Sequence, residues 1–296
     1  MLPFNLNILP LDSLIAVEKP LPKKVKAIRN EFLRTNHLPN PLLVSSEIDG
    51  RHMLLQGTNQ VCALRYMGVD YAVVQEIDPT EAKVQYLSWY HLVKHYKPEY
   101  LFAIADHYKL KYQPLPKPFE IEIENNKAIL GVFLNGEAYK IIPENGNLIN
   151  RANSINRFVE SYQSCSSHIK LYPDKIFLEA GDLFDQGSLL IIPPVYTPEE
   201  IYVLAQAKIQ FPPDYLNIVL NDRIVGLDFP LEVLRSPVDL EEKVNFLKEL
   251  VSMRLQSTDS NVYGGKVYFL NRKIFNPGSP FRGMGPDSIQ IRPELE

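Results

Sequence analysis

The stretch HMLLQGTNQVCALRYMG, residues 52–68, constrains the fold more than any other part of the chain. It predicts a short apolar strand, a sharp turn at Gly57, a polar trio and then an amphipathic helix. In such a layout the backbone N–H groups at the helix N-terminus can hold a phosphate. No charge, however, is carried by the residues beside the turn, which are Gln56, Thr58, Asn59 and Gln60. The pattern therefore allows a phosphate site, a reduced form of one, or only a tight connection.

The flanking segments extend this stretch into alternating strands and helices. Apolar periodicity predicts one helix over 21–35 and another over 58–67. Strands are predicted at NLNILPL, NPLLVSS, HMLLQ and YAVVQEI. Together these elements predict an α/β unit that ends near Asp78. Residues 80–113, which are rich in tyrosine, are expected to extend it as a helix, and QPLPKP at 113–118 is expected to be a linker.

The following residues, 119–271, predict an α+β domain. Its strands are expected at FEIEIE, KAILGVFL, AYKIIP, KIFLEA, SLLIIPP and KVYFLN. Amphipathic periodicity predicts helices over 147–164 and 239–256. The segment YLNIVLNDRIVGL is expected to form a hairpin around Asn221–Asp222.

Two local signals complete this description of the C-terminal half. The sequence Thr197-Pro198-Glu199-Glu200 has the form of a capping box with proline at the first helical position, so a helix is predicted to begin there. Residues 272–296 are rich in Pro and Gly and show almost no apolar periodicity, so they are expected to be a mobile tail or a partner-binding arm. The fold class is therefore α/β, with a domain over 1–113, an α+β domain over 119–271 and a tail.

Composition excludes several classes of function. The formal net charge of −4 argues against a dedicated DNA or RNA binder, which must neutralise phosphates with Lys and Arg. The two cysteines, Cys62 and Cys165, show no metal or redox spacing, which favours a reducing cytoplasm. The N-terminal residues lack the basic start of a signal peptide, and no apolar run approaches the length of a membrane span.

Few motifs carry chemistry by themselves. Neither a Walker-type loop nor a Gly-x-Gly-x-x-Gly fingerprint is present. His91 and His95 have the spacing of two ligands on one helix face, but no motif glutamate lies between them and no third ligand is evident, which favours packing or surface histidines and no metal site. Glu18 ends an apolar run just before a helix start. A carboxylate there could act as a general base on a substrate hydroxyl, although a solvated loop glutamate is the more common occurrence.

Short blocks along residues 1–271 resemble the ParB/sulfiredoxin-like superfamily, and in particular its free-serine kinase branch. In the first 78 residues the blocks are LPLDSL, NPLLVSS, HMLLQGTNQVCALRYMG and AVVQEID, with Gly57, Ala63, Leu64 and Gly68 at the positions the superfamily shares. Later blocks are LSWYH, VESYQSCSS, NIVLNDRIVGLDFPLEVL and GGKVYFL. Enzymes of this branch phosphorylate L-serine to O-phospho-L-serine, one of them as a step towards a siderophore. The resemblance implies a nucleotide-dependent kinase that uses ATP or ADP with Mg²⁺.

The resemblance also implies roles for individual residues. Glu18 matches the catalytic base. The nucleotide phosphates are expected at Gly57, Thr58, Asn59 and Gln60. Substrate contacts are expected from Trp89 and His91, and from the serines Ser161, Ser164 and Ser166 of a polar loop.

Several positions depart from the family pattern. The superfamily turn commonly reads Asp-Gly-x-His-Arg, but this chain has Gln56, Asn59 and Gln60 in place of the three side chains that carry chemistry. A Thr-Arg pair expected before the NI strand is Asp214-Tyr215. Because phosphoryl transfer depends on cations that spread the developing charge, these losses weaken the phosphate clamp.

Two functions therefore remain open. The first is a kinase for free serine or a related small hydroxylated metabolite. The second is a catalytically degenerate relative that works as a binding, regulatory or assembly factor with a protein partner. Sulfiredoxin activity is disfavoured because that family's reactive cysteine falls at Thr58. DNA partition is disfavoured because no basic helix-turn-helix follows. No nucleic acid and no membrane span are expected.

Overall fold

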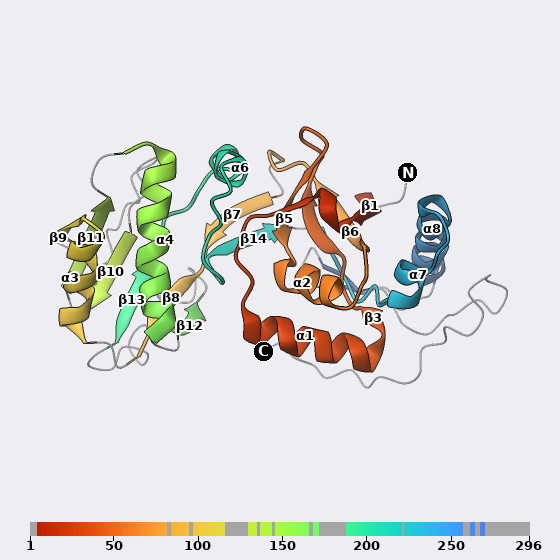
Figure 1. Ribbon diagram of the computed structural model, residues 1–296, viewed down its shortest axis with the longest axis horizontal. Coiled ribbons are helices and arrows are strands. Elements are labelled where there is room, and N and C mark those ends of the chain that lie inside the picture. The colour runs from red at the N-terminus through yellow and green to blue at the C-terminus, as the bar shows by residue number, and fades with distance from the viewer. Residues whose placement is uncertain are drawn as a thin grey trace. The chain divides into compact units, whose positions relative to one another are not determined.

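The computed structural model describes residues 5–81, 84–94, 97–115, 130–134, 137–143, 146–165, 168–171, 188–220, 222–256, 261–263 and 267–269. The chain is a mixed α/β protein that divides into two compact units (Figure 1). The first contains Met1–Ala16, Pro20–Val84 and Leu220–Glu296. The second contains Val17–Lys19 and Gln85–Val219, so that Glu18 belongs to the second unit. The domain boundaries expected from the sequence stay predictions.

A five-stranded mixed sheet is the centre of the first unit. Its order is β1-β6-β4-β5-β2, with β1 Leu6–Pro10, β2 Leu14–Ala16, β4 Leu42–Ser45, β5 His52–Gln56 and β6 Tyr71–Ile77. Strands β4 and β6 are parallel, as are β2 and β5, while β1–β6 and β4–β5 are antiparallel. The strands predicted in this part of the chain are confirmed.

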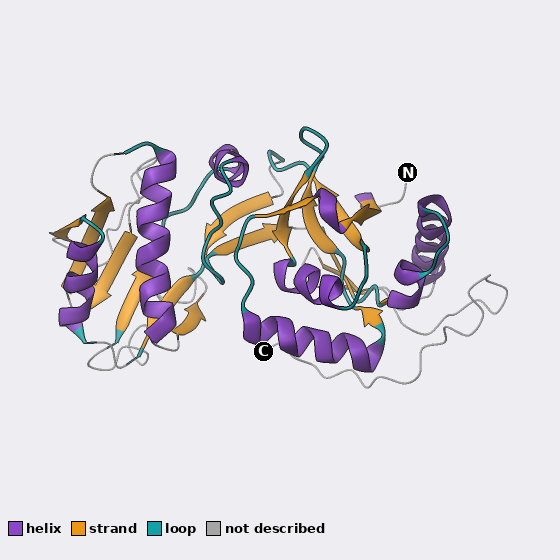
Figure 2. Cartoon of the chain, viewed as in Figure 1, coloured by secondary structure: helices purple, strands orange, loops and turns teal. Residues whose placement is uncertain are grey.

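Helices cover the core of this unit. Helix α1 (Pro22–Thr35) packs on α2 (Thr58–Tyr66), and α7 (Leu231–Arg235) and α8 (Leu240–Gln256) contact the sheet through β6 and β1 (Figure 2). The buried cluster includes Phe32 of α1, Leu64 of α2 and Leu247 of α8. Pro22 lies at the start of α1, where a missing N–H costs nothing.

Short strands complete the first unit. Strand β3 (His37–Leu38) pairs with β16 (Phe229–Pro230). Strand β15 (Arg223–Val225) runs parallel to β18 (Val267–Phe269), which pairs with β17 (Asn261–Tyr263). The sequence predicted instead a hairpin that joins 216–220 to 223–225, and that prediction is wrong. Strand β14 (Leu216–Leu220) pairs with β7 (Val84–Ser88), so both strands next to Asp222 find partners from distant parts of the chain.

The second unit contains a six-stranded sheet with the order β12-β8-β13-β10-β11-β9. The strands are β8 Tyr90–Val93, β9 Leu110–Leu115, β10 Leu130–Leu134, β11 Glu137–Pro143, β12 His168–Leu171 and β13 Leu189–Ile192. Its helices are α3 (Pro98–His107), α4 (Leu148–Cys165) and α6 (Pro198–Gln206). The buried side of α4 carries Ile155, Phe158, Val159 and Tyr162, at the spacing expected of an amphipathic helix.

The helix expected over 80–113 is confirmed only at α3 and is wrong for the rest of the segment. That segment contains β7, β8, α3 and β9. Strand β8 lies inside the sheet between β12 and β13 and is buried along nearly its whole length, and such a continuous apolar run does not show the alternation of a half-buried strand. The capping box is confirmed, with Glu200 N donating to Thr197 Oγ1 over 3.2 Å and Thr197 N donating to Glu200 Oε2 over 3.0 Å. FEIEIE, KIFLEA and the tail 272–296 lie outside the described residues.

Within the part of the chain that the structure describes, no helix has the length and apolar character needed to cross a membrane.

Candidate functional site

Glu18 lies in a short extended segment of the second unit, Val17–Lys19, which pairs in parallel with the chain at Phe211. Glu18 forms a β-bridge with Phe211. Phe211 N donates to Val17 O and Lys19 N donates to Phe211 O, each over 2.8 Å. These two main-chain bonds on either side of Glu18 fix where its side chain begins. Lys19 also forms an ion pair of 2.5 Å with Glu160 of α4.

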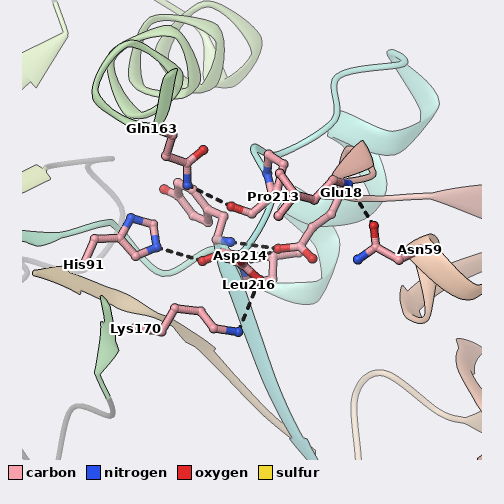
Figure 3. A network of polar contacts seen from close by, with 10 residues as sticks. Glu18, Asn59, His91, Gln163, Lys170, Pro213, Asp214 and Leu216 are labelled. Carbon is pink, nitrogen blue, oxygen red and sulfur yellow. Dashed lines mark hydrogen bonds and ion pairs between the residues drawn. The ribbon is translucent and has the colours of Figure 1, made fainter. Parts of the chain in front are cut away.

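The carboxylate of Glu18 is held by two consecutive main-chain N–H groups. Tyr215 N donates to Glu18 Oε1 over 2.9 Å, and Leu216 N donates to the same oxygen over 2.7 Å (Figure 3). Successive N–H groups that converge on one anion form a backbone nest. The other oxygen, Oε2, receives no hydrogen bond from any residue within the described ranges. One oxygen of Glu18 therefore anchors the carboxyl group, and the other remains able to accept a proton.

Burial raises the pKa of Glu18 from 4.5 to about 7. Loss of solvation is the largest cause, because the charged form is less stable away from water. The negative charge of Asp214 adds to the rise, while the two main-chain hydrogen bonds and the positive charge of Lys170 oppose it. A carboxyl group with this pKa exchanges protons near neutral pH, as a general base does.

The nest is part of a tightly held turn, residues 213–216, which we call the Asp214 turn. Asp214 has a φ of 62°, in the left-handed region that costs a residue with a side chain about 1 kcal/mol or more. Gln163 Nε2 donates to Pro213 O over 2.9 Å, and His91 Nε2 contacts Asp214 O at 2.8 Å. Trp89 N donates to Tyr215 O over 2.9 Å. Contacts from β8, its N-terminal neighbour Trp89 and α4 thus stabilise an otherwise unfavourable backbone.

Lys170 brings a positive charge to the same turn. Its Nζ atom lies 3.2 Å from Asp214 Oδ1 and 4.6 Å from the centre of the Trp89 ring. The ammonium therefore forms an ion pair and a cation–π contact at once. Because the Lys170 side chain is 34% exposed, this charge also remains within reach of a ligand from solvent.

His91, which was expected to contact substrate, lies inside the protein core. Its side chain is fully buried, and its two ring nitrogens contact Tyr162 Oη and Asp214 O. It also lies on β8, so the helix-face spacing considered for His91 and His95 does not apply, and His95 lies outside the described residues. His91 therefore supports the Asp214 turn from within the core.

The three serines expected beside the substrate are less informative. Ser161 Oγ donates to Phe158 O over 2.6 Å, within α4. Ser164 lies in the last turn of α4, and Ser166 lies outside the described residues. Their role as substrate contacts stays a prediction.

The Gly57 turn lies in the first unit and has the predicted strand–turn–helix form. Gly57 has a φ of 115°, and a Cβ atom there would lie 2.5 Å from Leu42 Cδ2, so glycine is required on two grounds. Within the described residues, the N–H groups of Thr58, Asn59 and Gln60 donate to no acceptor, as is usual at the start of a helix. Val61 N makes the first helical bond, to Gly57 O, over 2.9 Å.

Asn59 has a structural contact that the sequence did not predict. Its Oδ1 atom accepts a hydrogen bond of 2.8 Å from Leu21 N, at the residue that precedes α1. The side chain in the histidine position of the family motif thus links the start of α2 to the start of α1.

A protein-bound metal ion needs several donor side chains close together. The described residues contain no group of three or more His, Cys, Asp or Glu side chains that could hold a metal ion. A divalent cation that came with a nucleotide would need only one or two carboxylates, since phosphate oxygens and water complete its coordination.

Sequence reasoning missed the residues that hold Glu18. The nest consists of main-chain groups, which leave no signature in side-chain identity. Lys170 was missed because it meets Asp214 only through the register of β12 and β8, which pairs Lys170 with His91. The segment FPPDYLN contained a usable signal, because Pro-Pro-Asp favours a turn and Asp tolerates the left-handed region.

Comparison with known proteins gives the fold relationship. No protein-family model and no curated protein matches the sequence. Among solved structures, SbnI with a C-terminal truncation, from Staphylococcus aureus, is similar with a TM-score of 0.68 and 17% identity over 85% of this chain and 97% of that chain. A free serine kinase in complex with AMP is similar with a TM-score of 0.63 and 17% identity over 78% of this chain and 93% of that chain.

A conserved hypothetical protein from Pyrococcus furiosus matches with a TM-score of 0.62 and 16% identity, over 78% of this chain and 97% of that chain. These similarities cover nearly the whole of each solved chain. The protein therefore has the fold of the free serine kinase structures, at an identity that speaks for the fold alone.

Proposed function

We propose that this protein is a nucleotide-dependent kinase that acts on free serine or a related small hydroxylated metabolite, with Glu18 as its general base. The observation that carries the proposal is the state of the Glu18 carboxyl group. Two main-chain N–H groups hold Oε1, and burial raises the pKa of the group to about 7. A solvated loop glutamate would have neither property.

The proposed reaction needs one proton acceptor. The substrate hydroxyl oxygen attacks the terminal phosphorus of the nucleotide and forms the new P–O bond. The bond between that phosphorus and the bridging oxygen breaks, and the shorter nucleotide leaves. The hydroxyl proton passes to Glu18 Oε2, the carboxylate oxygen to which no described residue donates a hydrogen bond.

The fold supports this choice over other chemistries of a buried carboxylate. The similar free serine kinase structures are described in complex with AMP and with ADP. Fold alone fixes function poorly, so the proposal depends on the coincidence of that fold with a half-buried glutamate of raised pKa. The short sequence blocks of the ParB/sulfiredoxin-like superfamily point to the same assignment.

For the nucleotide, we propose the N-terminus of α2 as the phosphate site. Its partial positive charge and the N–H groups of Thr58, Asn59 and Gln60 favour an anion. The histidine and arginine of the family turn would each have added a charge-assisted hydrogen bond, worth roughly 1.5–3 kcal/mol. Without them we expect nucleotide affinity in about the millimolar range. Because the described residues offer no metal cluster, we propose that Mg²⁺ arrives bound to the nucleotide.

The test is a direct assay of product. The protein is incubated with L-serine, Mg²⁺ and either ATP or ADP, and O-phospho-L-serine is detected by ³¹P NMR. Glu18→Gln should lower turnover by roughly 10²-fold or more, because the amide cannot accept the proton, with nucleotide affinity unchanged. Glu160→Gln is the matched control, since Glu160 belongs to the same unit but pairs with Lys19, and its turnover should stay near that of the parent protein.

Two results would contradict the proposal. Equal turnover in the parent protein and in Glu18→Gln would remove Glu18 from the mechanism. Nucleotide binding without any phosphorylated product, across a panel of small hydroxylated metabolites, would instead identify the protein as a degenerate relative that works as a binding or assembly factor.

A further inference from the structure

One peptide group joins His91 to Glu18. The carbonyl oxygen of Asp214 and the N–H of Tyr215 belong to the same planar peptide and point in opposite directions. The oxygen contacts His91 Nε2 at 2.8 Å, and the N–H donates to Glu18 Oε1 over 2.9 Å (Figure 3). Because the peptide is planar and rigid, a rotation about its Cα–Cα axis moves both of these groups together. The orientation of the Glu18 carboxylate is therefore tied to the ring of His91.

The contacts of His91 define which nitrogen carries the proton. Asp214 O can only accept, so Nε2 must be the N–H that donates to it. In the neutral ring Nδ1 is then an acceptor, and it receives the hydroxyl of Tyr162. Tyr162 is itself buried on α4, so it fixes the ring from the side away from the turn.

The pairing of β8 with β12 brings two side chains to Asp214. His91 on β8 is paired with Lys170 on β12, and partners of this kind project to the same face. His91 holds the main-chain oxygen of Asp214, and Lys170 holds its carboxylate. Aspartate tolerates the left-handed region at a modest cost, and these two contacts hold Asp214 there by both its backbone and its side chain.

We infer that His91 is a positioning residue for Glu18, which acts through the Asp214–Tyr215 peptide and makes no contact with substrate. This inference rests on the proposed function for its catalytic consequence, but the positioning itself can be measured without any substrate.

The first measurement uses the unchanged protein. NMR titration follows the Glu18 side-chain carboxyl carbon, the amide protons of Tyr215 and Leu216, and the His91 ring nitrogens. We expect His91 as the Nε2–H form. We also expect its Nε2 proton shift to move with the Glu18 midpoint, because ionisation of Glu18 polarises the shared peptide. A Nδ1–H ring, or a Nε2 signal that does not respond at that midpoint, overturns the inference.

The second measurement uses a pair of substitutions. His91→Phe keeps a ring but removes the donor, whereas His91→Gln keeps an N–H near the position of Nε2. Hydrogen bonds to the charged form lower a carboxyl pKa, so loss of peptide alignment in His91→Phe should raise the Glu18 midpoint by about 0.5 pH unit or more. His91→Gln should restore most of the parent value. Asp214 and Lys170, the charged groups that act on Glu18, are unchanged in both variants.

The outcomes separate this inference from the proposed function. If the parent protein makes phosphoserine, His91→Phe should shift the rising limb of the kcat profile to higher pH and leave KM for the nucleotide unchanged. If it makes no product, the shift of the Glu18 midpoint still supports the positioning role. A folded His91→Phe with an unchanged Glu18 midpoint, and only a lower melting temperature, overturns the inference. If His91→Phe does not fold, the titration of the unchanged protein decides.

Discussion

His91 and Lys170 are direct partners across β8 and β12, and both hold Asp214, the histidine by the carbonyl oxygen and the lysine by the carboxylate. Asp214 thus has two functions in the turn. Its backbone presents the N–H groups that follow it to Glu18, and its side chain places a negative charge near that carboxylate. Substitution of the side chain alone separates the two effects.

We expect Asp214→Asn to lower the pKa of Glu18. The Asp214 charge raises that pKa and the Lys170 charge lowers it, so removal of the Asp214 charge leaves the Lys170 charge without a negative charge to oppose it, while burial and the main-chain hydrogen bonds are unchanged. Asparagine tolerates the left-handed conformation at φ 62°, so the turn should keep its shape. Carboxyl ¹³C titration measures the effect. A midpoint that rises would mean that the turn, and not the charge, had changed.

Glu18 should make the protein less stable as the pH rises. Its folded pKa of about 7 lies above the ordinary 4.5, so the folded state binds the proton more tightly than the unfolded chain. That contribution is complete below pH 4.5 and is lost as the pH passes through 7, which amounts to about 3 kcal/mol in the free energy of unfolding.

Glu18→Gln removes this dependence of stability on pH, because an amide does not titrate. The local structure should be kept, because the amide oxygen can still accept from Tyr215 N and Leu216 N. Urea unfolding at pH 5 and pH 8 should therefore show Glu18→Gln close to the parent at pH 5 and more stable at pH 8. Glu160→Gln should retain the full dependence. A parent protein equally stable at both pH values would contradict the raised pKa of Glu18.

Gly57 should be intolerant of alanine. The left-handed φ and the contact with Leu42 Cδ2 at 2.5 Å both oppose a Cβ atom, and together we expect a loss of at least about 2 kcal/mol. Gly68 is a matched control at the other end of α2. Its φ is 66°, but a Cβ atom there meets nothing within 4 Å, so Gly68→Ala should cost only about 1 kcal/mol. Chemical denaturation of the two variants makes the comparison, and equal losses would exclude the Leu42 contact.

Lys243 of α8 is a buried cation whose loss should be costly. It is 2% exposed, and its Nζ donates to Val233 O, Ser236 O and Ser236 Oγ over 3.2, 2.5 and 3.3 Å, at the end of α7. Lys243→Met would leave Ser236 O without its donor, at a cost of about 1–3 kcal/mol, whereas Val233 O keeps the hydroxyl of Ser236, which donates to it over 2.7 Å. Lys248 lies on the exposed side of the same helix, so Lys248→Met should change stability by less than about 0.5 kcal/mol. Thermal unfolding of both variants tests the difference.

Restored charge at the Gly57 turn should strengthen nucleotide binding. We expect Gln56→Asp with Gln60→Arg to raise affinity for ADP and ATP in the presence of Mg²⁺ by about tenfold or more, measured by calorimetry. Asn59 is left unchanged, because its side chain binds Leu21 N at the start of α1. Gln60→Glu is the control and should weaken binding. Micromolar binding by the parent protein would show that it holds phosphate by other groups.

Sequence periodicity predicted the elements whose signals are local. Helices α1 and α4 follow from their apolar faces, and α6 follows from the capping box at Thr197. The segment 80–113 was misjudged because β8 is buried inside a sheet, where an apolar run is compatible with either a helix or a strand. The wrong hairpin at 221–222 has a related cause, since β14 and β15 each pair with a strand that is distant in sequence.

The sequence offered candidate side chains for the site, but gave no sign of the main-chain groups that hold them. Family resemblance singled out Glu18 as a candidate base, a role that stays a proposal, and its raised pKa depends on burial that no local pattern encodes. His91 was expected to contact substrate, and that role stays a prediction. Its burial against Tyr162 depends on sheet register, which the sequence does not show. The nest at Tyr215 and Leu216 is invisible in sequence, since any residue except proline can supply an N–H.

The nest also sets an order of assembly during synthesis. Glu18 is separated from Tyr215 and Leu216 by 197 and 198 positions. A ribosome therefore adds most of the chain before the groups that hold this carboxylate exist, and until then Glu18 remains hydrated with the acidity of an ordinary glutamate. A nascent chain released before residue 216, or a fragment that begins after residue 18, could fold much of the six-stranded sheet and still lack a base that titrates near neutral pH.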